Sequence, residues 1–135
     1  TALLMATMSG VEVNLMFPCK PDHPFVYWAT LSYVGELIMA GANCYTYDNG
    51  FLHAKGLSID GKACCYGTAN MDIRSFELNF EVNAMIFDQN IAGEMERIFR
   101  EDLKCCTRIT KEMYKSRSVW IRFKEQISRL LSPVL

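Results

Sequence analysis

The spacing of apolar and polar residues predicts short strands that alternate with helices. Residues 1–10 are typical of the end of a helix closed by a glycine, and Val11 to Phe17 alternates as a strand does. The longest apolar stretch, residues 25–45, predicts a buried helix ended by Gly41 and then a strand from Cys44 to Tyr47. This order of elements favours an α/β fold with a largely parallel sheet flanked by helices.

A hairpin is predicted where Asp60 and Gly61 separate two alternating runs. An Asp-Gly pair suits a two-residue turn, because both of its positions favour positive φ. If these two residues form the whole loop, Ile59 faces Lys62, and the two strands pair backwards from there.

Polar side chains gather on one face of this predicted hairpin. His53 and Lys55 are two residues apart, so on a strand they point to the same side. The predicted register places Lys55 opposite Tyr66 and His53 opposite Thr68, and Asn70 follows with the same parity. The spacing therefore predicts a phosphate-binding pocket.

The rest of the chain predicts one more strand and two helices. Asn79 to Phe87 alternates, with Glu81 on the polar face, after a turn that contains Ser75. Helical spacing covers Gln89 to Cys106, and Ser118 suits the cap of a last helix. That helix has an apolar stripe beside three cations, and the stripe consists of Trp120, Phe123, Ile127, Leu130 and Leu131, with Arg122, Lys124 and Arg129 next to it.

Composition and charge narrow the class of protein. Half of the 135 residues are hydrophobic and 21% are charged, which suits one soluble domain. The net charge is −1, but residues 104–129 hold eight Lys or Arg and two Glu, so residues 1–103 carry about −7. An acidic body argues against nucleic acid as a partner, because binding it requires many phosphates to be neutralised.

The six cysteines do not form a disulfide or zinc pattern. Four of them are adjacent pairs, at 64–65 and 105–106, and neighbours on a strand point to opposite faces. We interpret all six as free thiols in a reducing compartment. No cluster of metal ligands stands out, and we expect neither a metal nor another cofactor.

The polar positions together spell H-x-K-x4-D-x6-G-[ST]-x-N, from His53 to Asn70. This pattern resembles the signature of the phospholipase D superfamily. The flanks PDHPFVYWAT, YDNGFLHAK, GTANMDIRSFELNFEVNA and RFKEQISRLLSPVL resemble the C-terminal catalytic half of bacterial cardiolipin synthases, nearly end to end. The resemblance implies a phospholipase D-like mixed sheet that lacks its first strand. Two places depart from the family pattern: Cys19, where a polar residue is expected, and the predicted strand 63–66, whose sequence is Ala-Cys-Cys-Tyr.

The resemblance also implies roles for the catalytic residues. His53 would attack a phosphodiester phosphorus and form a phosphohistidine. Glu81 would accept from the other ring nitrogen and fix its tautomer. Asp60 belongs to the catalytic motif, although we interpret it chiefly as the turn residue.

Three donors would bind the substrate phosphate. Lys55 and Asn70 would donate to the non-bridging oxygens, where charge grows in the transition state, and Thr68 would add a third donor. A leaving oxygen also needs an acid, and one copy of the motif supplies one histidine. His23, in a Pro-rich loop, is one candidate; a second H-x-K copy, in a missing N-terminal half or a second copy of the chain, is the other.

We therefore expect a phosphatidyltransferase that joins two phosphatidylglycerol molecules into cardiolipin. The expected organisation is a catalytic half-domain at 1–110, truncated at its N-terminus, and a cationic helical tail at 111–135 that meets an anionic membrane surface or packs as an ordinary helix. The expected location is the cytoplasmic face of the bacterial membrane, with the anchors outside this chain. The alternatives are a dimeric phosphodiesterase or nuclease of the same superfamily, an inactive truncated fragment, and a membrane-binding module.

Overall fold

The computed structural model describes residues 1–19 and 24–131. It consists of two compact units, one formed by Thr1–Leu52 with Cys106–Leu135 and the other by His53–Cys105. Both units combine helices with a small sheet, which confirms the mixed α/β class. Residues 111–131, predicted as a tail, belong to the first unit.

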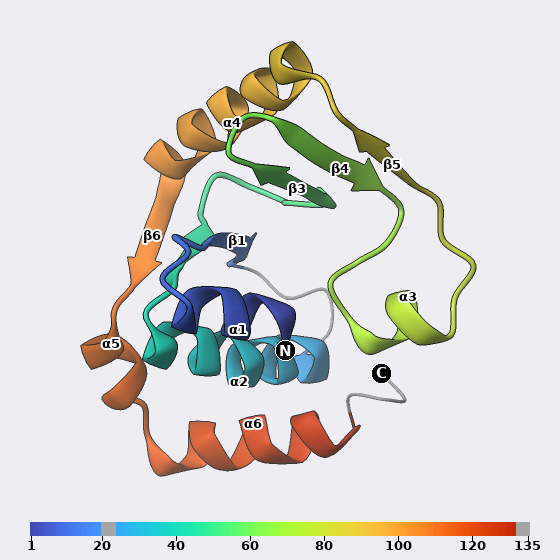
Figure 1. Ribbon diagram of the computed structural model, residues 1–135. Coiled ribbons are helices and arrows are strands. Elements are labelled where there is room, and N and C mark those ends of the chain that lie inside the picture. The colour runs from blue at the N-terminus through green and yellow to red at the C-terminus, as the bar shows by residue number, and fades with distance from the viewer. Residues whose placement is uncertain (20–23, 132–135) are drawn as a thin grey trace. The chain divides into compact units, whose positions relative to one another are not determined.

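The first unit contains a three-stranded sheet in the order β1-β2-β6 (Figure 1). The helix α2 crosses over between β1 and β2, so these strands are parallel, whereas β6 is antiparallel to β2. The bounds of its elements are α1 Ala2–Met8, β1 Asn14–Pro18, α2 Pro24–Ala40, β2 Asn43–Tyr47, β6 Cys106–Ile109, α5 Lys111–Lys115 and α6 Val119–Leu131. β6 was not predicted from the sequence.

The core of this unit lies between α2 and the sheet. Its buried residues are Phe17, Leu31, Val34, Ile38, Ala42 and Cys44. Gly41 ends α2 with φ of +116°, as predicted, and Gly10 closes α1 with φ of +89°. In the described part of the chain, no helix is long and apolar enough to cross a bilayer.

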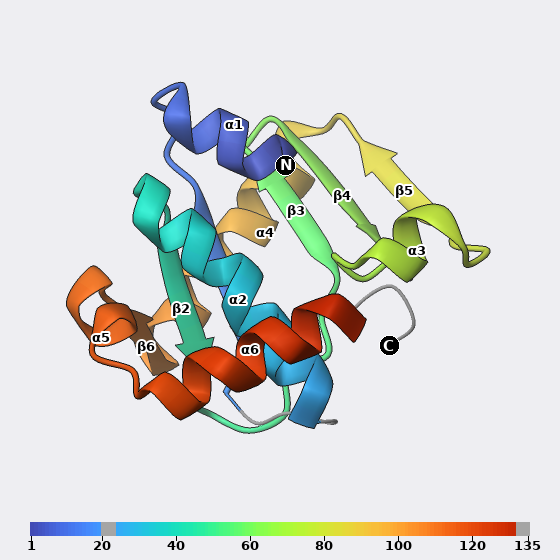
Figure 2. The same ribbon diagram turned by 90° about the horizontal axis from the view of Figure 1, so that it is seen from below.

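Two helices from opposite ends of the chain pack together in the first unit. α2 contacts α6; α6 lies next to α2 in Figure 1 and crosses it at an angle in Figure 2. α5 also contacts α2, where Gly35 leaves room for the ring of Tyr114; a Cβ at this glycine would lie 1.7 Å from the tyrosine Oη. The last helix is therefore an integral part of this unit.

The second unit contains an antiparallel sheet in the order β3-β4-β5, with α4 against β3 and β4. Its elements are β3 Gly56–Ile59, β4 Ala63–Gly67, α3 Ile73–Glu77, β5 Asn83–Ile86, α4 Gln89–Asp102 and the 3₁₀ turn Leu103–Cys105. Asp88 caps α4, because its Oδ1 accepts from the backbone N–H groups of Asn90 at 2.8 Å and Ile91 at 3.0 Å.

Three details of the sequence prediction are corrected. Of the four strand pairings in the described residues, only β1 with β2 is parallel, and the other three are antiparallel. The strand predicted from Asn79 to Phe87 is shorter, and its first four residues lie outside any strand. The predicted turn at 72–75 instead begins a helix at Ile73.

Candidate active site

His53 and Lys55 lie just before β3 and point to the same side. The Lys55 Nζ is 2.8 Å from the His53 Nε2. An ammonium group can only donate, so Nε2 must accept, which leaves the ring proton on Nδ1 in a neutral imidazole. The lone pair of Nε2 therefore points toward the Lys55 ammonium group.

The hairpin that carries these residues forms, but its register differs from the prediction by one residue. The Asp60-Gly61 turn is present, with φ of 51° and 60°, and the Lys62 N–H donates to the Ile59 carbonyl at 2.9 Å. The ladder nevertheless begins with Ile59 opposite Ala63, so Lys62 is an extra loop residue.

The shifted register changes the predicted cross-strand partners. Gly56, not Lys55, lies opposite Tyr66, and the Gly67 N–H donates to the Lys55 carbonyl at 3.3 Å. The Tyr66 ring lies over Gly56 near α4, since a Cβ on this glycine would be 3.0 Å from Tyr66 Cδ2 and 3.2 Å from Met95 Cε. The predicted pairing of His53 with Thr68 is therefore wrong, and Tyr66 is not the partner of the lysine.

Asp60 lies at the opposite end of β3 from Lys55. Four strand residues lie between them, so their Cα atoms are five steps, or roughly 16 Å, apart at the usual rise per residue. Its positive φ confirms the turn role that the sequence predicted.

The carboxylate of Glu81 lies among hydrogen-bond donors near Lys55. Hydrogen bonds from the Thr68 hydroxyl, and more weakly from Ser75 and Asn79, lower the pKa of Glu81 below its usual value, and the charge of Lys55 adds to this effect. The Asn79 Nδ2 is 3.4 Å from the Glu81 Oε1. The site therefore contains a carboxylate that stays ionised at neutral pH, next to a lysine that contacts an imidazole.

Backbone pairing between the end of β4 and the start of β5 positions this carboxylate. The Thr68 N–H donates to the Val82 carbonyl at 3.0 Å, and the Val82 N–H donates to Thr68 Oγ1 at 2.9 Å. Gly67 faces Asn83 at such close range that a Cβ would lie 2.2 Å from the Val82 oxygen. The glycine of the motif is therefore required by this close approach.

Ser75 is a site residue that sequence reasoning did not identify. Its side chain is buried, its Oγ accepts from the Asn70 N–H at 3.1 Å, and it hydrogen-bonds to Glu81. The Asp72 Oδ1 caps α3 by accepting from the Ser75 N–H at 2.7 Å. An Asp followed three residues later by Ser is a recognisable start of a helix, and it would have placed Ser75 in the first turn.

The structure brings most of the predicted site residues together in the second unit. His53 contacts Lys55, Glu81 contacts Thr68, and the backbone of Asn70 is fixed through Ser75. Asp60 is not part of this group. His23 lies outside the described residues. Within residues 1–19 and 24–131, no three His, Cys, Asp or Glu side chains are grouped as metal ligands would be.

This arrangement can bind and attack a phosphodiester. The neutral imidazole supplies a nucleophilic lone pair, and the ammonium beside it can neutralise a non-bridging oxygen. The histidine is exposed and the lysine is half-buried, so a substrate phosphate can reach both groups.

Comparison with known proteins identifies the relatives of this chain. Residues 1–103 match the family model described as cardiolipin synthase, PLD-like domain. The chain is 57% identical over 134 residues to the major cardiolipin synthase ClsA of Bacillus subtilis, and 56% identical to a cardiolipin synthase of Oceanobacillus iheyensis and to cardiolipin synthase 1 of Staphylococcus epidermidis. Each match covers 99% of this chain but only 27–28% of the relative.

Proposed function

The chain belongs to the family of cardiolipin synthase, PLD-like domains, and from this premise we propose that it is one catalytic half of a phosphatidyltransferase. The proposed reaction joins two phosphatidylglycerol molecules into cardiolipin and releases glycerol. The observation that carries the proposal is the 2.8 Å contact between Lys55 Nζ and His53 Nε2, which holds a nucleophile and a phosphate-binding cation together.

The first step is a displacement at phosphorus. The Nε2 lone pair of His53 forms the N–P bond while the P–O bond to the glycerol headgroup breaks, and the leaving oxygen takes a proton from an acid. In the free site, Lys55 donates a hydrogen bond to the Nε2 of His53. When a substrate phosphate binds, Lys55 donates to the phosphate oxygen instead, and the Nε2 lone pair becomes available for attack. We assign Asn70 as a further donor to the phosphate oxygens, and Thr68 as another when its single hydroxyl proton turns from the Glu81 carboxylate to the phosphate.

The second step returns the histidine to its starting state. The primary hydroxyl of a second phosphatidylglycerol attacks the phosphorus, its proton passes to a base, and the N–P bond breaks. We assign to Glu81 the role of stabilising the cationic imidazole of the intermediate, and the hydrogen bonds that lower its pKa keep it charged for this purpose.

The acid and base opposite His53 come from outside this site. We propose a second H-x-K site as their source, in the part of the longer protein that this chain does not cover or in a second copy of the chain. The chain spans about 28% of the length of its curated relatives, which leaves room for such a site.

We place the reaction at a membrane surface, on its cytoplasmic side. The substrates are lipids, and all six cysteines are free, which suits a reducing compartment. Cys105 is exposed, and its thiol would be at risk of oxidation in an oxidising compartment.

The test uses radiolabelled phosphatidylglycerol with the chain alone and with the chain mixed with the part of the Bacillus relative that it does not match. We expect an acid-labile label on the protein, followed by cardiolipin and glycerol. His53→Ala should abolish both, and Lys55→Gln should slow transfer by about 100-fold or more, as loss of a preorganised donor does.

Lys62→Gln is the matched control, because Lys62 is an exposed cation on the same hairpin but in its loop. Its transfer rate should equal that of the wild type. Label on the protein of His53→Ala, or equal loss in both lysine variants, would refute the assignment. Phosphatidic acid as the product, without cardiolipin, would indicate a phosphodiesterase instead.

A further inference from the structure

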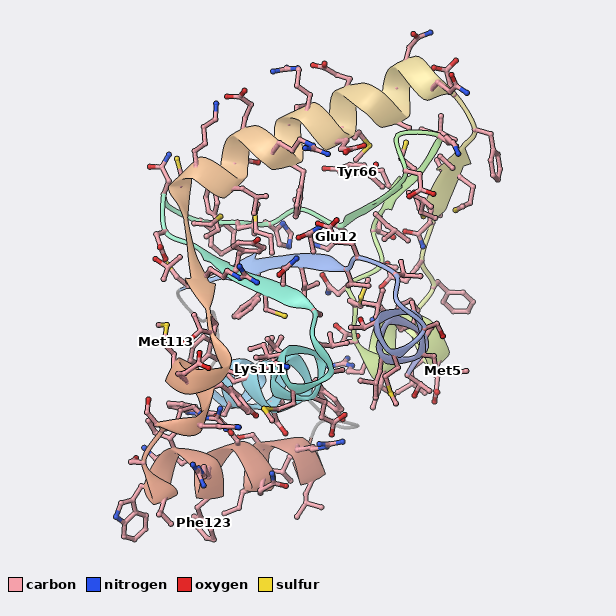
Figure 3. All side chains as sticks on the ribbon, turned by 60° about the vertical axis from the view of Figure 1, so that its left-hand side comes forward. Met5, Glu12, Tyr66, Lys111, Met113 and Phe123 are labelled. Carbon is pink, nitrogen blue, oxygen red and sulfur yellow. The ribbon has the colours of Figure 1, made fainter. Side chains whose placement is uncertain are left out.

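The apolar side of α6 faces outward. Its large apolar residues are exposed to solvent, at 78% for Val119, 76% for Trp120, 57% for Phe123 and 82% for Leu130. The Trp120 and Phe123 rings contact each other edge to face, with centroids 6.5 Å apart. Figure 3 shows Phe123 on the side of α6 that faces away from α2. These residues form what we call the outer face of α6: Val119, Trp120, Phe123, Ile127 and Leu130.

The polar side of the same helix faces inward. Glu125 and Ser128 are each 1% exposed, and the Glu125 carboxylate pairs with Arg117 at 2.9 Å. Arg129 pairs with Glu36 of α2 and stacks over Tyr33, 4.8 Å from its ring centre. The inward packing is therefore held by ion pairs and cation–π contacts, which fix the outer face toward solvent.

Cations flank the outer face on both sides. Successive helical residues are about 100° apart, so the outer face spans an arc of about 100°. Lys124 lies at one edge of this arc, with its Nζ 5.6 Å from the centre of the Trp28 ring, and Arg122 lies toward the other edge. An apolar face of this width with a cation on each side is the arrangement of helices that lie in the surface of an anionic bilayer.

Other occupants suit this face less well. A partner helix would bury the apolar stripe but would bring no anionic group to Lys124 and Arg122 beside it, whereas a bilayer that contains anionic lipid satisfies both. The aromatic pair also suits the boundary between headgroups and acyl chains, where Trp is enriched. The net excess of six positive charges over residues 104–129 adds long-range attraction to such a surface.

We propose that the outer face of α6 docks the first unit on an anionic lipid surface, with Trp120 and Phe123 inserted at the headgroup boundary. This docking deepens the proposed function and rests on it only for the choice of phosphatidylglycerol as the lipid. It needs no catalytic residue, because α6 lies in the first unit and His53 in the second.

The chain has two tryptophans, which gives a direct spectroscopic test. Trp28→Phe leaves Trp120 as the only fluorophore, and its emission should shift to the blue on adding vesicles of phosphatidylglycerol and phosphatidylcholine. Trp120→Phe leaves Trp28, which packs against the core and should show no shift. If Trp28→Phe fails to fold, the difference between the wild type and Trp120→Phe gives the same signal.

Vesicle co-sedimentation measures the strength of docking. Phe123→Ser should weaken binding by about tenfold or more, because an inserted aromatic side chain returns to water. Lys124→Gln should weaken it by about fivefold on anionic vesicles and not at all on neutral ones. The double variant Met5→Ser with Met8→Ser is the matched control, since these α1 residues are 64% and 74% exposed and lie away from α6 in sequence.

His53→Ala separates this proposal from the catalytic one. It should bind vesicles like the wild type, so lost turnover with retained binding would leave the docking proposal intact. No Trp120 shift on anionic vesicles, an equal shift on neutral vesicles, or an equal loss in the methionine control would each overturn the proposal. A dimer in sedimentation equilibrium that Phe123→Ser converts to monomer would assign the face to a second copy instead.

Discussion

Replacing Gly67 with alanine perturbs the catalytic site through a single added methyl group. The new Cβ would lie 2.2 Å from the Val82 carbonyl oxygen, 2.3 Å from Asn83 Oδ1 and 2.6 Å from Asn83 Cα. Ordinary contacts are near 3.5 Å, so the start of β5 must move away from β4 by about 1 Å. Two of the three contacts are backbone atoms, which cannot turn aside as a flexible side chain could.

This displacement has a predictable cost. Overpacking of this kind destabilises a fold by about 1–3 kcal/mol. It also separates Thr68 from Val82, which are joined by hydrogen bonds of 2.9 and 3.0 Å, and so displaces the neighbouring Glu81. A 1 Å misplacement in a catalytic site can lower the rate by about 100-fold, and we expect a loss of this order in phosphatidyl transfer.

The assay compares phosphatidyl transfer and urea unfolding in Gly67→Ala and in a matched variant, Gly93→Ala. A Cβ at Gly93, inside α4, meets no atom within 4 Å, so this variant should keep full transfer and gain up to about 1 kcal/mol of stability. Wild-type transfer and stability in Gly67→Ala would show that β4 and β5 do not approach as closely as described. The reasoning about the motif glycine would then be refuted.

Three further predictions concern other buried groups. Burial, only partly offset by Arg117, raises the pKa of Glu125, so the stability that this group contributes falls as pH rises from the ordinary carboxyl range through the raised value. Arg117→Met should lower the free energy of unfolding in urea by about 3–5 kcal/mol at pH 7 and by less near pH 4. An equal loss at both pH values would contradict a stabilising ion pair between Arg117 and Glu125. Burial raises the pKa of Cys44 to about 11, so iodoacetamide should modify exposed Cys105 far faster, as mass spectrometry would report. Ser75→Ala should raise the pKa of the site glutamate toward its usual value in a carbon NMR titration and lower stability by about 1 kcal/mol; an unchanged pKa would remove this serine from the site.

Local sequence rules predicted the parts of the site that depend on one strand or one turn. His53 and Lys55 share a side because the alternation of an extended segment needs no knowledge of its partner. The Asp60-Gly61 reversal follows from the positive φ that both positions adopt. The pairing partners of these residues could not be predicted in the same way, because one extra loop residue, Lys62, shifts the whole ladder.

The contacts of the site that join different helices and strands could not be predicted as well from the sequence. Ser75 joins the site because the α3 cap at Asp72 turns its hydroxyl toward both Asn70 and Glu81. The segment before Asn83 alternates like a strand but pairs only through Thr68 and Val82, so its periodicity overestimated the length of β5. The family resemblance correctly predicted the class of protein, which periodicity alone does not specify.

The orientation of α6 shows where a hydrophobic pattern is insufficient. The stripe predicts an amphipathic helix, and the usual rule places its apolar side against the core. Here the neighbouring surface of α2 presents Glu36 and Tyr33, which are partners for a cation rather than for an apolar side chain. Arg129 meets both, and Arg117 compensates the charge of Glu125 where the helix is buried, so the polar side can pack without leaving that carboxylate unpaired. The apolar side must then face solvent in the free chain. Burying this exposed apolar surface in lipid would be favourable, and that is the driving force for the proposed docking.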